Sequence, residues 1–166
     1  MFRVSATARV LIVGQAPGTK VHMTGVPWND ASGDRLRSWL GMDREQFYDE
    51  ARIAIVPSGL CYPGRFEKGG DRPPTPACAP LWLDRFVRLM PAIRLTLLVG
   101  SYALRHRLGP GAMTDRVRRF QDVGPAIVPL PHPSWRTTGW ERRNPWFTAE
   151  LLPVLRAAVA SVMAEP

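Results

Sequence analysis

Four short runs rich in Val, Ile and Leu, each bounded by glycine or proline, constrain the fold of this chain more than any other feature. They span residues 8–13, 52–57, 94–100 and 126–131. Runs of this length and composition are typical of strands that are buried on both faces of a sheet. Helical patterns separate them, and this alternation favours parallel strands covered by helices. We therefore predict an α/β fold, a three-layer sandwich around a mostly parallel, four-stranded central sheet.

The segments between the runs carry helical patterns. Asp43 and Gln46 have the spacing of a capping box, and Gly41 ends the preceding pattern. At 166 residues and 45% hydrophobic composition, the chain has the size and core of one domain, residues 1–166. Helices are expected over residues 32–40, 43–51, 77–90, 102–108, 114–120 and about 145–163.

The chain is strongly basic, with a formal net charge of +8, and all but two of its 22 basic residues are arginine. This excess of positive charge is expected of a protein that binds a polyanion, because guanidinium groups bind phosphates and stack on bases. A genome rich in arginine codons would give the same bias, so charge alone names no ligand. No apolar run approaches the roughly 18 residues of a membrane span, and no signal-like segment is found. We expect a cytoplasmic protein with no membrane contact.

Long loops follow the first, second and fourth runs. The carboxyl ends of parallel strands meet at one edge of a sheet, and ligands of such sheets bind there. Each loop exceeds an ordinary connector of about 4 to 6 residues, which is typical of functional loops. Phosphate-binding and hydrolase signatures are absent, since "GQAPGTK" and "VGSYA" have the wrong glycine spacing. The loops span residues 14–30, 58–76 and 132–146.

Five motifs occur in a fixed order along these segments. They are "GQAPG" at 14–18, "GVPWNDASGDRL" at 25–36, a cysteine-bearing loop after the second run, "LVGSYAL" at 98–104 and "LPHPS" at 130–134. Together they resemble the uracil-DNA glycosylase superfamily, nearest to the bacterial branch with a GEAPG-like first motif. The resemblance covers about residues 9–144. It implies a monomeric DNA repair enzyme that flips uracil out of DNA and hydrolyses its N-glycosidic bond, leaving an abasic site.

The resemblance gives roles to residues at the strand ends. Trp28 stands where the family stacks an aromatic ring on the base, although a core tryptophan is the alternative. His132 matches the histidine that donates a hydrogen bond to uracil O2 as negative charge builds on the departing base. The turn after the first strand would hold the base or the attacking water with its backbone. Its residues are Gly14, Gln15, Ala16, Pro17 and Gly18.

The segment after His132 falls where the family inserts a wedge into DNA. Ser134, Trp135 and Arg136 follow it, and a tryptophan can fill the space of the flipped nucleotide while Arg136 grips a phosphate. Arg142 and Arg143 are further candidates for phosphate contacts, with a solvated charged surface as the alternative reading.

The first motif departs from the family because it lacks a general base. Ala16 stands where other branches carry a carboxylate or asparagine, and Gln15 replaces the glutamate of the nearest branch. Gln15 can only orient a water. Asp30 and Asp71 are the carboxylates that remain as candidate bases, and a helix cap or a loop hydrogen bond is the alternative for each.

Two further departures concern base recognition and cofactors. The asparagine expected to read the uracil edge is displaced by Pro57 and Ser58, so Ser58 is the substrate-binding candidate there. Cys61 and Cys78 match only half of the four cysteines that hold an iron–sulfur cluster in the nearest branch. We expect no cluster, no other cofactor and two buried, reduced thiols.

Two other functions stay open. One is a non-catalytic DNA-binding relative that lost its chemistry with Ala16, and the other is a nucleotide- or nucleoside-binding enzyme unrelated to DNA. The net charge favours the DNA-related functions. The intact "HPS" and Trp28 favour the uracil-DNA glycosylase over its non-catalytic relative.

Overall fold

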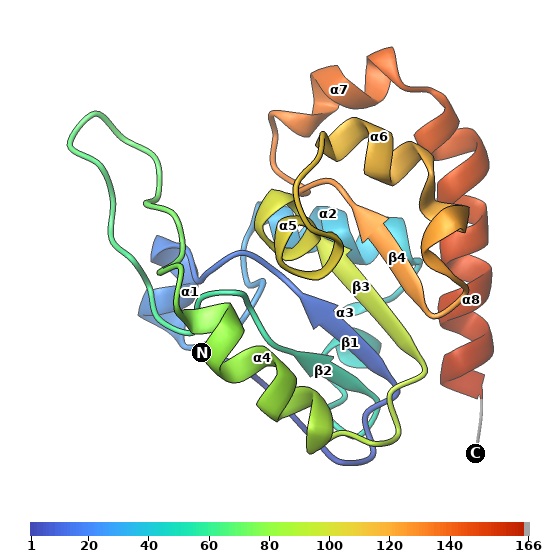
Figure 1. Ribbon diagram of the computed structural model, residues 1–166, viewed down its shortest axis with the longest axis horizontal. Coiled ribbons are helices and arrows are strands. Elements are labelled where there is room, and N and C mark those ends of the chain that lie inside the picture. Colours follow the sequence, from blue (N-terminus) through green and yellow to red (C-terminus); the bar gives the residue numbers. More distant parts are fainter. Residues whose placement is uncertain (165–166) are drawn as a thin grey trace.

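A computed structural model gives the fold and describes residues 1–164. Its four strands form one sheet in the order β2-β1-β3-β4, and each neighbouring pair is parallel (Figure 1). The predicted sheet is therefore confirmed, and each strand lies within its predicted apolar run. The strands are β1 (Val10–Val13), β2 (Ile53–Ile55), β3 (Leu95–Val99) and β4 (Ile127–Leu130).

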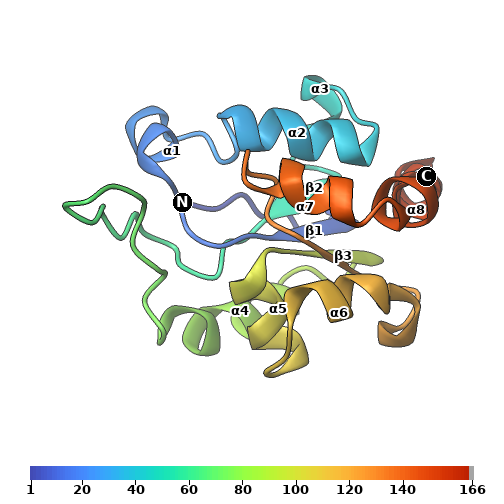
Figure 2. The same cartoon turned by 90° about the horizontal axis from the view of Figure 1, so that it is seen from above.

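Helices cover both faces of the sheet, as expected for a three-layer sandwich (Figure 2). On one face lie α2 (Ala31–Leu40), α3 (Arg44–Phe47) and α8 (Leu152–Ala164), and on the other lie α4 (Cys78–Arg88), α5 (Ser101–Leu108) and α6 (Met113–Arg118). Short helices α1 (Thr19–Thr24) and α7 (Thr137–Arg143) follow β1 and β4. A 3₁₀ turn, η1 (Phe120–Val123), and a π-helical turn, η2 (Phe147–Leu151), complete the described elements.

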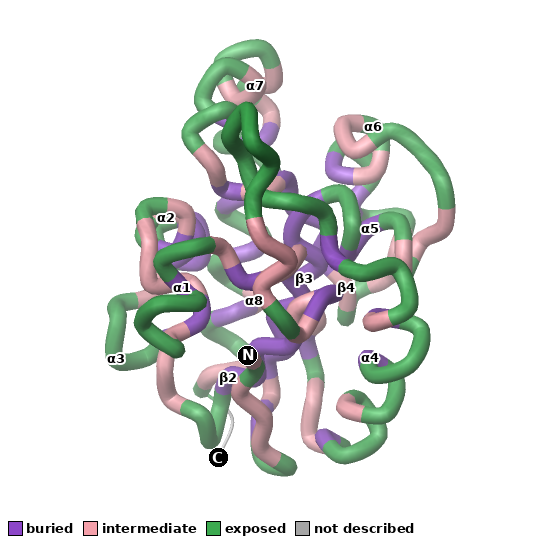
Figure 3. The backbone as a smooth tube through the Cα atoms, turned by 90° about the vertical axis from the view of Figure 1, so that its left-hand side faces the viewer, coloured by how far each residue is buried: buried purple, intermediate pink, exposed green. Residues whose placement is uncertain are grey.

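The core explains why the strand runs are apolar without alternation. Every residue of β1 and β2 is buried, because helices cover the sheet on both sides. Figure 3 shows this buried centre and the exposed loops around it. Phe147 is fully buried and packs edge-on against Trp39 and Trp140, at centroid distances of 5.0 and 5.3 Å.

Three helices, α3, α1 and α7, differ from the predictions. The capping box of Asp43 and Gln46 is present, but α3 ends at Phe47 because the chain turns at Asp49, whose side chain accepts the Ala51 N–H at 3.0 Å. The last helical stretch, Phe147–Ala164, matches the helix predicted at about 145–163 and opens with a π-helical turn. Helices α1 and α7 occupy segments that were expected to be loops. They were not predicted because each buries only one residue, so its sequence shows no apolar period.

Within the described residues, Phe147–Ala164 is the one helical stretch long and apolar enough to cross a membrane by length and composition. Leu151, Leu152, Leu155 and Val159 of this stretch are buried in the core. These residues belong to the side of the stretch that packs against α2, β1 and β3, whereas only 28% of the whole stretch is buried and Val154 is 49% exposed.

Candidate active site

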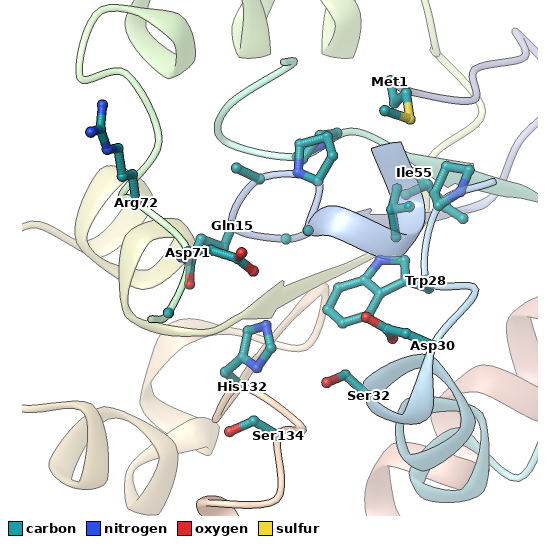
Figure 4. Close-up of a pocket in the computed structure, with 18 of the residues that line it drawn as sticks. Met1, Gln15, Trp28, Asp30, Ser32, Ile55, Asp71, Arg72, His132 and Ser134 are labelled. Atoms are coloured by element: carbon teal, nitrogen blue, oxygen red, sulfur yellow. The ribbon is translucent and has the colours of Figure 1, made fainter. Parts of the chain in front are cut away.

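A cavity of about 420 Å³ opens at the carboxyl ends of the strands. It lies where the chain leaves β1 toward one face of the sheet and β3 toward the other, and α/β sheets bind ligands at such points. The loops after β1, β2 and β4 all line it, as the sequence predicted for these long loops (Figure 4).

Trp28 forms one wall of the cavity, and its backbone is held in an unusual conformation. It has a φ of 56°, in the left-handed region that non-glycine residues seldom adopt. Arg37 of α2 donates a hydrogen bond to the Trp28 carbonyl at 3.4 Å. A Cβ on Gly33 would lie only 1.7 Å from the same oxygen, so α2 can approach this turn only with glycine there. Such a conformation persists because the surrounding structure fixes it.

The neighbours of Trp28 are held by α3 and the residue after it. Tyr48 donates its hydroxyl to the Pro27 carbonyl at 2.7 Å, and Arg44 donates to Asn29 Oδ1 at 3.0 Å. The backbone of the turn is therefore fixed on both sides of Trp28, which lowers the ordering cost of binding.

The turn after β1 forms the floor beside the indole. The Gly14 carbonyl accepts the N–H and the hydroxyl of Ser58, at 2.9 and 2.8 Å, and the Gln15 carbonyl accepts the Gly59 N–H at 2.8 Å. Among residues 1–164, no hydrogen bond uses the N–H of Gln15 or Ala16, and both residues line the cavity. These amides are donors available to a ligand, whereas Pro17 has no N–H to offer.

His132 follows β4 and forms the wall opposite the turn. Its ring lies 5.8 Å from the Trp28 ring, centroid to centroid, at an interplanar angle of 35°. Burial lowers the pKa of His132 below 6.5, and the negative charges of Asp30 and Asp71 only partly oppose this shift. The imidazole is therefore neutral at pH 7 and can donate one N–H while carrying no charge.

An aromatic wall, a neutral imidazole and free backbone amides thus share one cavity at the strand ends. The family model of the uracil DNA glycosylase superfamily matches residues 2–156. The chain belongs to the uracil DNA glycosylase superfamily. This membership confirms the resemblance to the superfamily that was drawn from the five motifs. It supports a glycosylase-type function in DNA repair and implies that the protein binds DNA.

The loop that carries His132 is anchored to α2. The His132 carbonyl accepts the Ser134 N–H at 2.8 Å and also the Thr137 hydroxyl. Arg35 donates to the Ser134 carbonyl at 3.1 Å and forms an ion pair with Glu141 at 3.0 Å. Sequence reasoning missed Arg35, whose partner Ser134 lies in a distant loop, and Arg37, whose partner is the carbonyl of the Trp28 turn.

Asp30 lines the cavity and also begins α2. Its Oδ1 accepts the Gly33 N–H at 2.8 Å, which makes it the N-cap of this helix. The capping role considered from the sequence is therefore present in the structure. Asp71 lines the cavity from the loop after β2.

Ser58 lies outside the cavity lining. Only 4% of its surface is exposed, and its hydroxyl is bound to the Gly14 carbonyl. The structure thus gives Ser58 a part in holding the Gly14 turn. In place of the expected contact with substrate, Ser58 borders a second hollow beside α4 and α5.

The expected wedge residues gather at the cavity mouth. Ser134, Trp135 and Arg136 all line it, Trp135 is 78% exposed, and the Arg136 guanidinium lies 5.5 Å from the Trp135 ring centroid. Arg142 and Arg143 belong to the last turn of α7 and do not line the cavity.

The two cysteines are free thiols in the structure, but the expectation that both are buried is wrong, because Cys61 lies in the exposed part of the loop after β2 and Cys78 is only partly buried at the start of α4. Within the described residues, no group of three or more His, Cys, Asp or Glu side chains is placed to hold a metal ion. The residues that are present therefore do not form a binding site for an iron–sulfur cluster on four thiolates.

Proposed function

We propose that the protein is a DNA glycosylase that hydrolyses the N-glycosidic bond of uracil in DNA and leaves an abasic site. The observation that carries this proposal is the pairing of Trp28 with neutral His132 across a cavity of about 420 Å³. One side chain offers a face for stacking a base, and the other offers a hydrogen-bond donor for its edge.

Binding begins when the nucleotide leaves the stack, which costs a few kcal/mol. Stacking of the flipped base on the Trp28 indole offsets roughly 1–3 kcal/mol of this cost. The N–H groups of Gln15 and Ala16 donate to a carbonyl oxygen of the base. Gly14 keeps this floor open, because a Cβ there would lie 2.9 Å from Trp28 Cζ2.

The chemistry then depends on stabilising the leaving base. As the bond between N1 and C1′ breaks, its electron pair moves onto the uracil ring and negative charge gathers at O2. His132 donates a hydrogen bond to this oxygen, and a donor fixed in place before the reaction is worth about 2.7–4 kcal/mol. Because its pKa is lowered, His132 does this as a neutral imidazole.

DNA contact is proposed for the cavity mouth. Trp135 is exposed there and would fill the space left by the flipped nucleotide, while Ser134 and Arg136 bind flanking phosphates. Arg142 and Arg143 would extend this contact along α7.

The test uses an oligonucleotide that contains a single uracil, followed by alkali to cleave abasic sites, with the matching thymine oligonucleotide as control. We expect cleavage of the uracil strand alone. His132→Ala should lower the single-turnover rate roughly 10²–10³-fold, the effect of losing one donor that stabilises developing charge. Intact uracil DNA after prolonged incubation with the wild-type protein would refute the proposed function.

A non-catalytic DNA-binding relative is the second candidate. The observation that favours it is that Ala16 supplies no carboxylate and Asp30 is engaged as a helix cap. This candidate predicts tight binding to uracil DNA without release of uracil, so the same incubation together with a binding measurement separates the two.

A further inference from the structure

The loop between β2 and α4 contains a small hairpin, residues 64–72, which borders the cavity. Arg65 and Asp71 form an antiparallel bridge, and the Arg72 N–H donates to the Gly64 carbonyl at 2.9 Å. Gly69 and Gly70 turn the chain with φ values of 90° and 85°, where residues with a side chain are strained. The hairpin thus gives the backbone at Asp71 a defined course within an exposed loop, residues 65–73 (Figure 1).

Asp71 extends from this hairpin into the cavity. Figure 4 shows its carboxylate beside Gln15, with His132 below it. Its Oδ2 would lie 3.2 Å from a Cβ on Gly18, so the absence of a side chain at Gly18 leaves room for the carboxylate. Within the described part of the chain, no hydrogen bond or ion pair engages the Asp71 carboxylate.

The other carboxylate of the cavity is differently placed. Asp30 lies beside Trp28, on the side of the cavity away from Asp71 (Figure 4). One of its oxygens is bound to the Gly33 N–H at the start of α2. Asp71 keeps both oxygens available, and it shares its side of the cavity with the side chain of Gln15.

We propose that Asp71 is the general base for uracil excision and that Gln15 and Asp71 together bind the attacking water. This inference rests on the proposed function. The oxygen of the water forms a bond to C1′ as the bond from C1′ to N1 breaks. The electron pair of the broken bond leaves with uracil toward His132, and Asp71 takes the proton from the water, leaving a hydroxyl on C1′. The base missing from the first motif is thus supplied by a different loop.

The experiment measures single-turnover excision of uracil by Asp71→Asn and Asp71→Ala. The control is Glu67→Gln, a carboxylate on the same hairpin that does not line the cavity. Asp71→Asn should cut the rate constant at least about 100-fold, the lower range for loss of a general base, and Glu67→Gln should match the wild type. Added formate should restore part of the rate of Asp71→Ala, because a small carboxylate can occupy the vacated space.

A second measurement separates chemistry from binding. The affinity of Asp71→Asn for DNA carrying a 2′-fluoro analogue of deoxyuridine, which resists cleavage, should equal that of the wild type. An equal loss of rate and affinity, or no rescue by formate, would overturn the role of Asp71. The role of Asp71 would also be overturned if the wild type excises uracil and Asp71→Asn excises it at the same single-turnover rate. Wild-type protein that leaves uracil in place would instead refute the proposed function, and the role of Asp71 with it.

Discussion

At the scale of single residues, the cavity depends on glycines as much as on reactive side chains. Gly14 makes room for the indole of Trp28, Gly18 makes room for the carboxylate of Asp71, and Gly33 lets α2 approach the Trp28 carbonyl. A methyl group at any of these positions would move one of the groups to which we give a role. The site is therefore defined partly by where side chains are missing.

The lowered pKa of His132 gives a prediction about stability. Well above pH 6.5 the imidazole is neutral in both the folded and the unfolded chain, because the pKa of His132 is lowered from 6.5 on folding. As the pH falls below 6.5, the unfolded chain takes up a proton that the folded protein does not, so the free energy of unfolding decreases by at most about 1.4 kcal/mol per pH unit. His132→Gln removes this loss.

Urea unfolding at about pH 7.5 and about pH 5.5 checks this prediction. The wild type should lose more stability on acidification than His132→Gln does. The other histidines, His22 and His106, are common to both proteins and cancel in the comparison. Equal losses would show that His132 titrates alike in the folded and unfolded chains.

The sequence predicted roles for Trp28 and His132 from the motifs "PWND" and "LPHPS", and the structure brings both residues to one cavity. The sequence left Asp30 and Asp71 undecided, because local sequence does not tell which carboxylate is engaged by a backbone amide. Arg35 could not be found because its partner, the Ser134 carbonyl, is brought to it by the packing of α2 against a loop distant in the sequence. Arg37 could not be found because its partner, the Trp28 carbonyl, is placed by a turn of unusual geometry.

At the scale of elements, α2 links the two walls of the cavity, and its N-cap gives a second prediction. Asp30→Ala removes the side-chain acceptor for the Gly33 N–H and should cost about 1 kcal/mol of stability, whereas Asp30→Asn keeps a good cap. If Asp71 is the base, the single-turnover rate of Asp30→Asn should stay near that of the wild type.

Thermal unfolding and single-turnover rates of both Asp30 variants check this. A melting temperature that falls in Asp30→Ala alone, with an almost intact rate in Asp30→Asn, identifies Asp30 as a cap. An unchanged melting temperature with a collapsed rate in Asp30→Asn would make Asp30 the general base instead of Asp71.

The sheet could be predicted because a strand buried on both faces must be apolar throughout, as in "VLIV" at 10–13. Helices α1 and α7 could not, because helices of six and seven residues with one buried side chain carry no periodic signal. The hairpin at residues 64–72 could not be predicted either, because its glycines indicate turns but do not indicate that the hairpin borders the cavity.

At the scale of the whole molecule, substitution of the cysteines tests whether an iron–sulfur cluster contributes to uracil excision. Cys61 is exposed, Cys78 is partly buried, and no further cysteine exists in the sequence. We predict a colourless protein in which Cys61→Ser combined with Cys78→Ser retains excision, because neither thiol lines the cavity. Absorbance and iron analysis of the purified wild type check this, and stoichiometric iron whose removal abolishes activity would contradict it.

The net charge of +8 gives the last prediction, which concerns DNA affinity as a function of salt. Each phosphate neutralised on duplex DNA releases counterions and adds roughly 0.9 to the slope of log affinity against log salt concentration. Arg136 lies at the cavity mouth beside exposed Trp135, so Arg136→Ala should reduce the slope by about one.

Arg88 is the matched control, because it is the last residue of α4, at the end of that helix that points away from the cavity (Figure 1). Arg88→Ala should leave the slope unchanged, so titrations of both variants at several salt concentrations distinguish a contact made by Arg136 from a general effect of charge. A slope that falls equally in both variants, or in neither, would show that Arg136 binds no phosphate.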